Sequence, residues 1–334
     1  MKRIVILLLA AALTCACAKQ ETTGVSTDAK RYLDAYMEVN YPGLKPDALG
    51  VYTLEETPGT GAPAEDNTFV RLEYTISSVD GIIGSSTYAD INKQIGGYKS
   101  FYYYGPKVWN RGEKLDKLSV GLEDAIAGMR VGGHKKVLIP GWLSETGKRL
   151  KNPDKYVLQC SGANAIYDLT LVDAFKDVNE WQRDSIKRYM AANFPGAVED
   201  PDQEGFWYIR TKEPSDTNAF TANDTIYINY TAMRLDGSVI DSSIERTAKR
   251  HGFYSASRTY AAQKIKWNSD YTKITMGGSS SLKKGFAYAV YKMHHGEEGT
   301  AVFWSDLGYG AGGSGSSIPA YSPLRFDIEV LEND

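Results

Sequence analysis

The sequence predicts an α+β protein made of two tandem units, each a helix followed by a mostly β domain. The prediction rests on the length of the chain, an internal repeat and alternating apolar residues after each copy of that repeat. With 334 residues, of which 42% are apolar, the chain is long enough for two domains that each bury a core. Binding to nucleic acid needs a strongly basic face, and a net charge of −3 gives no electrostatic argument for one, so we expect no nucleic-acid partner.

The repeat is clearest where each predicted helix ends. Residues 36–43 recur as residues 189–196, and both copies finish with Asn-aromatic-Pro-Gly. The residue before a proline avoids the helical region, so this string stops a helix. The apolar residues that share one helix face are Tyr32, Leu33, Tyr36 and Met37 in the first copy and Trp181, Ile186, Tyr189 and Met190 in the second. We therefore expect an amphipathic helix before each domain, either as a spacer between domains or packed on a sheet.

A strand-rich block follows each helix. Residues 71–75 match residues 227–231, and the distance in sequence between these two segments is nearly the same as between the two helices, which indicates one duplicated unit. The boundary between the units falls near residues 174–178. The predicted organisation of the chain is a signal peptide at 1–16, a tether at 17–26, a first unit at 27–175 and a second unit at 176–334.

The N-terminus predicts export. Two basic residues precede an unbroken apolar run at residues 4–13 and a small-residue segment, which is the pattern of a secretory signal. The run is too short to span a bilayer as a permanent helix. Cys17, with Ala16 before it, resembles the cysteine of a bacterial lipobox that receives the lipid. Cys15 is an alternative lipidation site. A cut by ordinary signal peptidase nearby, without lipidation, is a further alternative.

The second unit carries several motifs in a fixed order. They are Tyr230, the Asp-Gly turn at 236–237, residues 240–243, a helix-like segment at 282–293, residues 305–310 and Ile318 with Pro319 before the last strand. Together, over residues 205–332, they resemble the family of FKBP-type peptidylprolyl cis-trans isomerases. This resemblance implies an antiparallel sheet wrapped on one short helix. The first unit matches the same pattern more faintly, so two FKBP-like domains are expected.

The resemblance also implies a pocket for proline. An X–Pro amide isomerises over a barrier of about 18–20 kcal/mol, and a catalyst lowers it with an apolar pocket and placed hydrogen-bond donors. Such chemistry needs no metal and no cofactor, and we expect neither. By the resemblance, the catalytic residues are Tyr309, Asp241 and Tyr230, and the substrate-binding residues are Ile240, Phe286, Ile318 and Phe326.

The second unit departs from the family pattern at several positions. Ile240 replaces a phenylalanine, Phe286 replaces the tryptophan of the pocket floor, and Lys283 replaces an aliphatic residue. The first two changes keep an apolar surface of different shape. An insertion at about residues 244–270 is expected to cover or extend the pocket.

The first unit lacks most of the pocket residues. Gly84 and Ser85 stand at the Phe-Asp positions, Leu122 at the tryptophan position and Glu145 near the position of the catalytic tyrosine. The two tyrosines that it keeps, Tyr74 and Tyr167, are expected to face the core. We expect no isomerase activity in the first unit.

The sequence therefore predicts an exported isomerase or proline-directed folding factor, active only in its C-terminal unit, whose partners are proline-containing exported polypeptides. The alternative is a non-catalytic accessory lipoprotein of an outer-membrane complex. A lipid on Cys17 would place either protein in the cell envelope, at the outer membrane facing the periplasm. The contacts of the aromatic stretch at residues 101–104 stay open at this point.

Overall fold

The computed structural model describes residues 25–111, 118–144, 162–278 and 280–332. The predicted signal peptide, the lipidation candidate Cys17, most of the tether and Glu145 lie outside the described residues. Helix α1 (Val25–Asn40) includes the last two residues of the predicted tether, which therefore ends earlier than expected. Among the described helices, none is both long and apolar enough to cross a bilayer.

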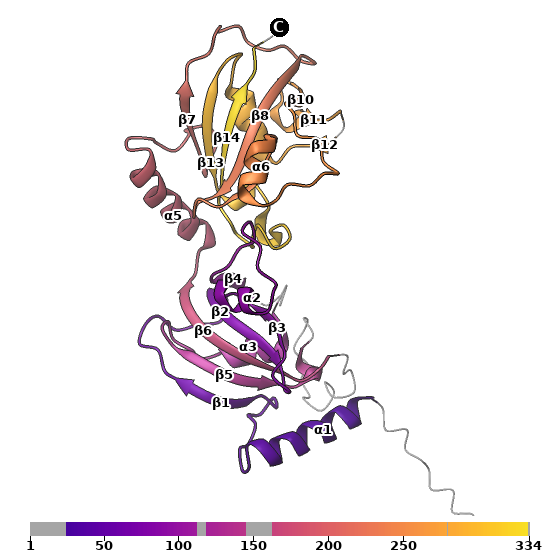
Figure 1. The fold of residues 1–334 in the computed structure, drawn as a ribbon. Coiled ribbons are helices and arrows are strands. Elements are labelled where there is room, and N and C mark those ends of the chain that lie inside the picture. The colour runs from indigo at the N-terminus through magenta and orange to yellow at the C-terminus, as the bar shows by residue number, and fades with distance from the viewer. Residues whose placement is uncertain (1–24, 112–117, 145–161, 279, 333–334) are drawn as a thin grey trace, which may run out of the picture.

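Two antiparallel sheets form two domains, one above the other in Figure 1. In the first domain the strands run in the order β1 (Tyr52–Thr57), β5 (His134–Ile139), β6 (Ala165–Phe175), β2 (Phe69–Ser78) and β3 (Ile83–Ser86), with β4 (Lys107–Asn110) also paired to β2. Within residues 41–111, 118–144 and 162–175, the helical elements are α2 (Ala89–Gln94), α3 (Val120–Ile126) and the short turn η1 (Gly141–Leu143).

The second sheet repeats this order. Its strands are β7 (Phe206–Lys212), β13 (Glu298–Phe303), β14 (Leu324–Val330), β8 (Thr225–Arg234), β10 (Gln263–Lys266), β11 (Thr275–Met276) and β12 (Ser280–Ser281), with β9 (Val239–Ser242) paired to β8. The helical elements are α6 (Glu245–His251), α7 (Lys284–Lys292), η2 (Tyr271–Lys273), η3 (Ser305–Leu307) and η4 (Gly310–Gly312). The predicted α+β architecture with two antiparallel sheets is confirmed.

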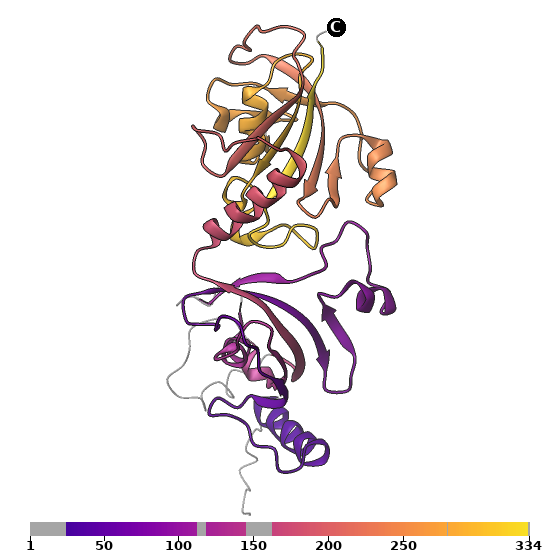
Figure 2. The same cartoon turned by 90° about the vertical axis from the view of Figure 1, so that its left-hand side faces the viewer.

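Each long helix belongs to the core of the domain that follows it. Leu33 and Met37 of α1 are buried in the first core, and Ile186 and Met190 of α5 (Val178–Asn193) are buried in the second. Figure 2 shows α5 lying against the upper domain. The helices therefore pack on their own domains and are not free spacers. Tyr32, expected on the buried face of α1, is 57% exposed.

Helix α7 packs closely against β13 of the second sheet. A Cβ atom on Gly285 would lie 2.5 Å from Cγ of Phe303, so only glycine allows the helix to approach β13 this closely. Gly121 does the same in α3, where a Cβ would lie 2.4 Å from the side chain of Ile139. The close helix–sheet approach is thus part of the repeated unit.

The segment at residues 244–270, expected as an insertion that covers or extends the pocket, has a counterpart in the first domain. It contains α6 and β10, and the first domain places α2 and β4 at the same points of its sheet. Even side-chain details recur: Tyr98 stacks on Tyr104 with ring centroids 5.1 Å apart, and Tyr254 stacks on Tyr260 at 5.4 Å.

Candidate functional site

A cavity of about 580 Å³ opens in the second domain between the sheet and α7. All seven residues that the sequence assigns to the pocket lie in its wall, namely Tyr230, Ile240, Asp241, Phe286, Tyr309, Ile318 and Phe326. They come from β8, β9, α7, the segment between η3 and β14, and β14 itself. The fold therefore brings together in one place residues that span nearly a hundred positions of the chain.

Three aromatic rings form the floor. Phe286 of α7 stacks on Phe326 of β14 with centroids 4.7 Å apart, and Tyr230 of β8 lies 5.3 Å from Phe286. All three side chains are buried. The strand neighbour of Phe326 on β8 is Ala232, whose small side chain leaves the floor open to the cavity. An apolar floor of this kind fits a proline ring and excludes water from it.

The polar edge joins β8 to β9. Tyr230 donates a hydrogen bond from its hydroxyl to Oδ2 of Asp241 at 2.7 Å. Arg258, from the loop after α6, forms an ion pair with Asp241, and its Nη2 donates to the Tyr230 hydroxyl at 3.2 Å. The sequence did not single out Arg258, because no pattern near it marks a site, although its segment was expected to cover or extend the pocket.

The hydroxyls of Tyr230 and Tyr309 stay protonated at neutral pH. Burial, together with the charge of Asp241 and the hydrogen bond to it, raises the pKa of Tyr230 far above its ordinary value, although Arg258 opposes this. Burial raises the pKa of Tyr309, and the Asp241 carboxylate raises it further. The Tyr230 hydroxyl donates its proton to Asp241, whereas the Tyr309 hydroxyl can donate to a ligand in the cavity.

Tyr309 stands at the start of a loop that forms the opposite rim. Nζ of Lys283, the residue before α7, lies 4.4 Å from the centre of its ring. Backbone hydrogen bonds of 2.7 and 3.1 Å between Ser314 and Ile318 close the loop. Gly313 has φ +61°, and a Cβ there would lie 2.3 Å from the Ile318 carbonyl oxygen. The loop geometry therefore requires glycine at this position.

The first domain has the same arrangement of strands around this point but not the same side chains. Ser85 pairs with Ile76 across β2 and β3, as Asp241 pairs with Ala232, so no carboxylate stands at this point. Tyr74 is buried in the first core and Tyr167 packs against that core, as expected. Leu122 also packs there.

The first domain nevertheless reaches the pocket of the second. Residues 96–106, which follow α2 and lead into β4, are called the arm here. The arm rises toward the upper domain in Figures 1 and 2, and Tyr102 at its tip lines the cavity. Sequence reasoning left the contacts of this aromatic stretch open, since nothing in the pattern of one domain shows where a loop meets another domain.

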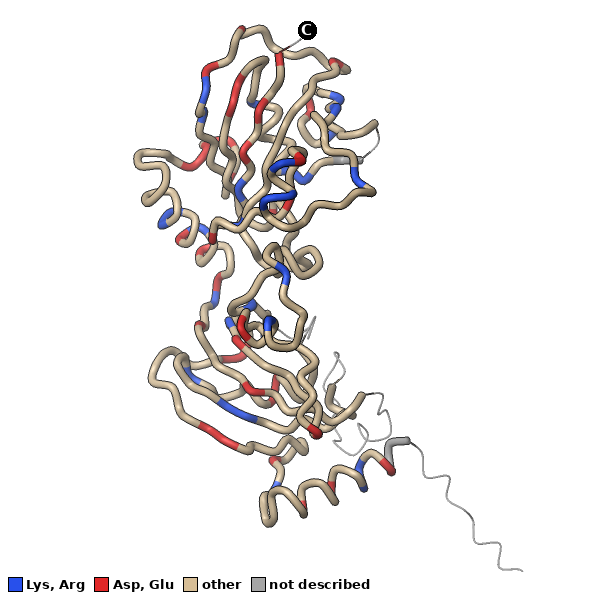
Figure 3. Tube along the Cα trace, viewed as in Figure 1, with Lys and Arg blue, Asp and Glu red and all other residues tan. Residues whose placement is uncertain are grey.

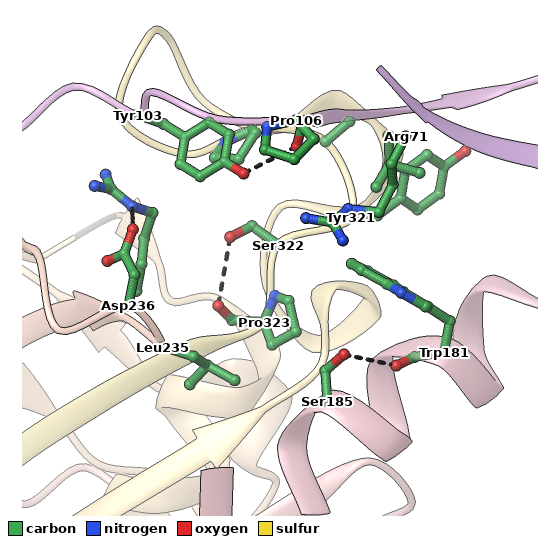
Figure 4. Close-up of a pocket in the computed structure, with 14 residues that line it drawn as sticks. Arg71, Tyr103, Pro106, Trp181, Ser185, Leu235, Asp236, Tyr321, Ser322 and Pro323 are labelled. Atoms are coloured by element: carbon green, nitrogen blue, oxygen red, sulfur yellow. Dashed lines mark hydrogen bonds and ion pairs between the residues drawn. The ribbon is translucent and has the colours of Figure 1, made fainter. Parts of the chain in front are cut away.

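A second cavity, of about 170 Å³, lies between the domains (Figure 4). Tyr103 and Pro106 of the arm line one side, and Leu235 and Pro323 of the second domain line another. The guanidinium of Arg71 lies over the Trp181 ring at 5.3 Å. This cavity contains none of the predicted pocket residues and marks the junction of the two domains.

Charges of both signs are interspersed along the described chain (Figure 3). Within residues 25–111, 118–144, 162–278 and 280–332, no three side chains of His, Cys, Asp or Glu gather as a metal site. The neighbouring His294 and His295 point to separate partners: His294 Nδ1 lies 3.4 Å from Glu297, and the His295 ring packs edge-on against Phe220.

Comparison with known proteins gives consistent matches. The model of the family described as FKBP-type peptidyl-prolyl cis-trans isomerase matches residues 217–331. FK506-binding protein 1A of Aspergillus fumigatus is 31% identical over 108 residues, which are 32% of this chain and 76% of that protein. The macrophage infectivity potentiator of Trypanosoma cruzi is 30% identical over 137 residues, 41% of this chain and 56% of that protein.

A longer match runs through both domains. Peptidyl-prolyl cis-trans isomerase FKBP10 of Bos taurus is 23% identical over 290 residues, 86% of this chain and 38% of that protein. The chain thus spans about half the length of the Trypanosoma cruzi protein and less than half the length of FKBP10. The solved structure of the three FKBP domains of wheat FKBP73 aligns over 85% of this chain and 95% of that one, with 14% identity and a TM-score of 0.30.

Proposed function

The chain belongs to the FKBP-type peptidyl-prolyl cis-trans isomerase family, and from this we propose that its second domain isomerises X–Pro bonds while the first serves as a scaffold. One observation carries the proposal: all seven residues expected of the pocket line a single cavity with an aromatic floor and a polar edge. The proposed substrates are proline-containing polypeptides in an extended, unfolded state.

The pocket geometry suggests how the barrier is lowered. The proline ring would rest on Phe286 and Phe326, away from water that stabilises the planar, polar amide. Tyr309, in the wall of the cavity, would donate a hydrogen bond to the carbonyl beside the twisting bond. The hydrogen bond from Tyr230 orients Asp241 at the edge. Each residue acts by binding the twisted amide better than the planar one.

A non-catalytic binding role is the second candidate, and one observation favours it. Arg258 forms an ion pair with the Asp241 carboxylate and a hydrogen bond with the Tyr230 hydroxyl, so both polar groups of the pocket edge already have a partner within the protein. A pocket with such an edge holds a proline segment without a free carboxylate to act on it. In this reading the protein would be an accessory subunit of an outer-membrane complex.

The two roles are separated by a protease-coupled prolyl isomerisation assay on the full chain. Under the enzyme proposal, wild type accelerates the reaction, and Tyr309→Phe and Asp241→Ala each reduce kcat/KM by about tenfold, the effect of losing one placed hydrogen bond. Ser85→Ala, at the position of the first domain that matches Asp241, is the control and leaves the rate unchanged. No acceleration by wild type, with proline peptides still bound, would establish the binding role instead.

Export and lipid anchoring are part of the proposal. They are supported by the basic and apolar N-terminal segment and by Cys17 after a small residue. Growth of a bacterial host that expresses the full chain with labelled palmitate tests this directly. Wild type and Cys15→Ala should incorporate label in the membrane fraction, and Cys17→Ala should not. Label retained by Cys17→Ala but lost from Cys15→Ala would move the anchor, and no label in any form would contradict lipidation.

A further inference from the structure

The arm of the first domain is fixed to the rim of the pocket by direct hydrogen bonds. The backbone N–H of Tyr103 donates to the carbonyl oxygen of Ser316 at 2.8 Å. Arg234 of β8 donates from Nη1 to the Ser317 carbonyl at 2.7 Å and to the Phe101 carbonyl at 3.3 Å, and from Nη2 to the Tyr102 carbonyl at 3.3 Å. One guanidinium therefore holds the arm and the pocket rim together.

Arg234 is well suited to this task because it is itself buried, with 4% of its surface exposed. Asp236 accepts from its Nε at 3.1 Å, and the Tyr103 ring lies 5.4 Å from the guanidinium carbon. A buried cation requires its partners, so removal of the arm would leave the charge with unmet donors. The contact is thus a built junction and not a chance approach of two surfaces.

Further contacts hold the tip of the arm on the second domain. Phe101 packs edge-on against Phe253, with ring centroids 6.2 Å apart. Ser100 donates from its hydroxyl to the His251 carbonyl at 2.8 Å. Both partners lie at the end of α6, in the segment that also carries Arg258. The arm is therefore held at the pocket rim and at the neighbouring loop.

The arm is also stiff within itself. Its two flanking tyrosines stack, and the backbone N–H of Lys99 donates to the Tyr104 hydroxyl at 2.9 Å. The hydroxyl of Tyr103 donates to the Pro106 carbonyl at 2.9 Å, and the N–H of Gly105 donates to the Thr87 carbonyl at 2.8 Å. A preorganised loop binds with little loss of conformational entropy.

The repeat relates Tyr102 to a residue already found in the pocket. Tyr102 is the fourth residue after Tyr98, and Arg258 is the fourth after Tyr254, so they occupy equivalent positions in the two copies of one loop. Arg258 reaches the polar edge of the pocket, and Tyr102 lines the same cavity from the other domain. Two copies of one loop thus border a single site.

We propose that the pocket is composite, and that Tyr102 of the first domain binds the residues that flank the proline of an extended polypeptide. The inference rests on the proposed function of the second domain. The floor of Phe286 and Phe326 accounts for the proline ring alone, whereas Tyr102 lies on the wall that a longer chain leaving the pocket would meet. The first domain, which lacks the pocket residues of its own, then contributes to binding in the second.

Peptide length provides the test. Two peptides with the same central X–Pro bond are compared on the full chain, a short blocked dipeptide amide and an eight-residue peptide, by calorimetric Kd and by kcat/KM. Tyr102→Ala and Phe101→Ala should weaken the longer peptide about tenfold, the loss expected for one aromatic contact in an interface. Both should change binding of the short peptide less than twofold. Tyr32→Ala, which removes an exposed tyrosine of α1, is the control and should change neither.

The outcomes separate the two proposals. Equal weakening of both peptides by Tyr102→Ala, or no weakening of either, would overturn the composite site and leave the proposed function standing. Failure of wild type to bind or isomerise either peptide would overturn the proposed function, and this inference with it. Because Tyr102 is half-buried at the surface of the arm, thermal unfolding of each variant checks that the fold is intact, and Phe101→Ala supplies a second, independent disruption of the arm.

Discussion

Arg258 is ion-paired with Asp241 at the mouth of the pocket, and it also contacts the Tyr230 hydroxyl. The Arg258 side chain is 37% exposed and that of Asp241 is 39% exposed. Pairs this open to water contribute only about 0–1 kcal/mol, because solvent screens them. The cation therefore covers the polar edge without holding it permanently closed, and a bound peptide can displace it at low cost.

Arg258→Ala should raise kcat/KM for a proline peptide about two- to fivefold, because Asp241 and Tyr230 no longer have to exchange partners. The free energy of unfolding should change by less than about 1 kcal/mol. Wild type should also gain activity as salt rises from low to physiological ionic strength, since screening weakens the pair. The variant should not respond in this way. Arg250→Ala, in the last turn of α6, serves as the control, and a decrease in activity for Arg258→Ala would show instead that Arg258 binds substrate.

Phe286→Leu gives the pocket floor of the second domain the residue type that the first domain has at the equivalent position, Leu122. The pocket stays apolar but loses the ring that stacks on Phe326 at 4.7 Å. We expect kcat/KM to fall about tenfold, and stability to fall by about 1–2 kcal/mol, the scale of a partial cavity in a core. The isomerisation assay and urea denaturation measure the two effects. Unchanged activity would mean that the ring does not contact the proline.

Gly285→Ala should destabilise the second domain by about 1–3 kcal/mol, because the added methyl group would strike the Phe303 ring and push α7 off the sheet. Phe286 follows directly, so the floor should move and proline binding should weaken as well. Gly237→Ala is the matched control: its φ of +84° makes alanine costly, but nothing lies within 4 Å of the new Cβ. That variant should lose about 1 kcal/mol, with peptide binding unchanged. Thermal unfolding and calorimetry distinguish the two.

Stability should fall at acid pH through Glu297. Burial alone would raise the pKa of this carboxylate, but hydrogen bonds from Tyr208 at 2.6 Å, Arg210 at 2.9 Å and the His294 N–H at 3.0 Å outweigh it and lower the pKa below its ordinary value. A folded-state pKa below the unfolded one gives stability that is present at neutral pH. It is lost as pH falls through the folded-state value.

We therefore expect the free energy of unfolding to be nearly constant from pH 7 to about pH 5 and to decrease below about pH 4. Glu297→Gln should lower stability at pH 7 and flatten the decrease in acid, whereas Glu213→Gln, an exposed partner of Arg210, should change neither. Urea denaturation across this range measures both. An unaltered acid slope in Glu297→Gln would assign the effect to other carboxylates, such as Asp200, whose pKa is also lowered.

The sequence by itself determined the duplication, the helix ends and the wall of the pocket. The duplication and the helix ends follow from short-range patterns, namely a repeated string and a proline that stops a helix. The wall of the pocket follows from the resemblance of the ordered motifs to the FKBP family. The resemblance set Ser85 of the first domain against Asp241 of the second, and the strand pairing of Asp241 with Ala232 and of Ser85 with Ile76 agrees with it.

Only the tertiary structure decided what surrounds that pocket. The position of Arg258 depends on how the loop after α6 folds back, and the position of Tyr102 depends on how two domains meet. The junction is made by Arg234 binding backbone carbonyls at Phe101, Tyr102 and Ser317. Carbonyl groups are the same in every residue, so such a contact leaves no signature in the sequence, and it exists only once both domains are in place.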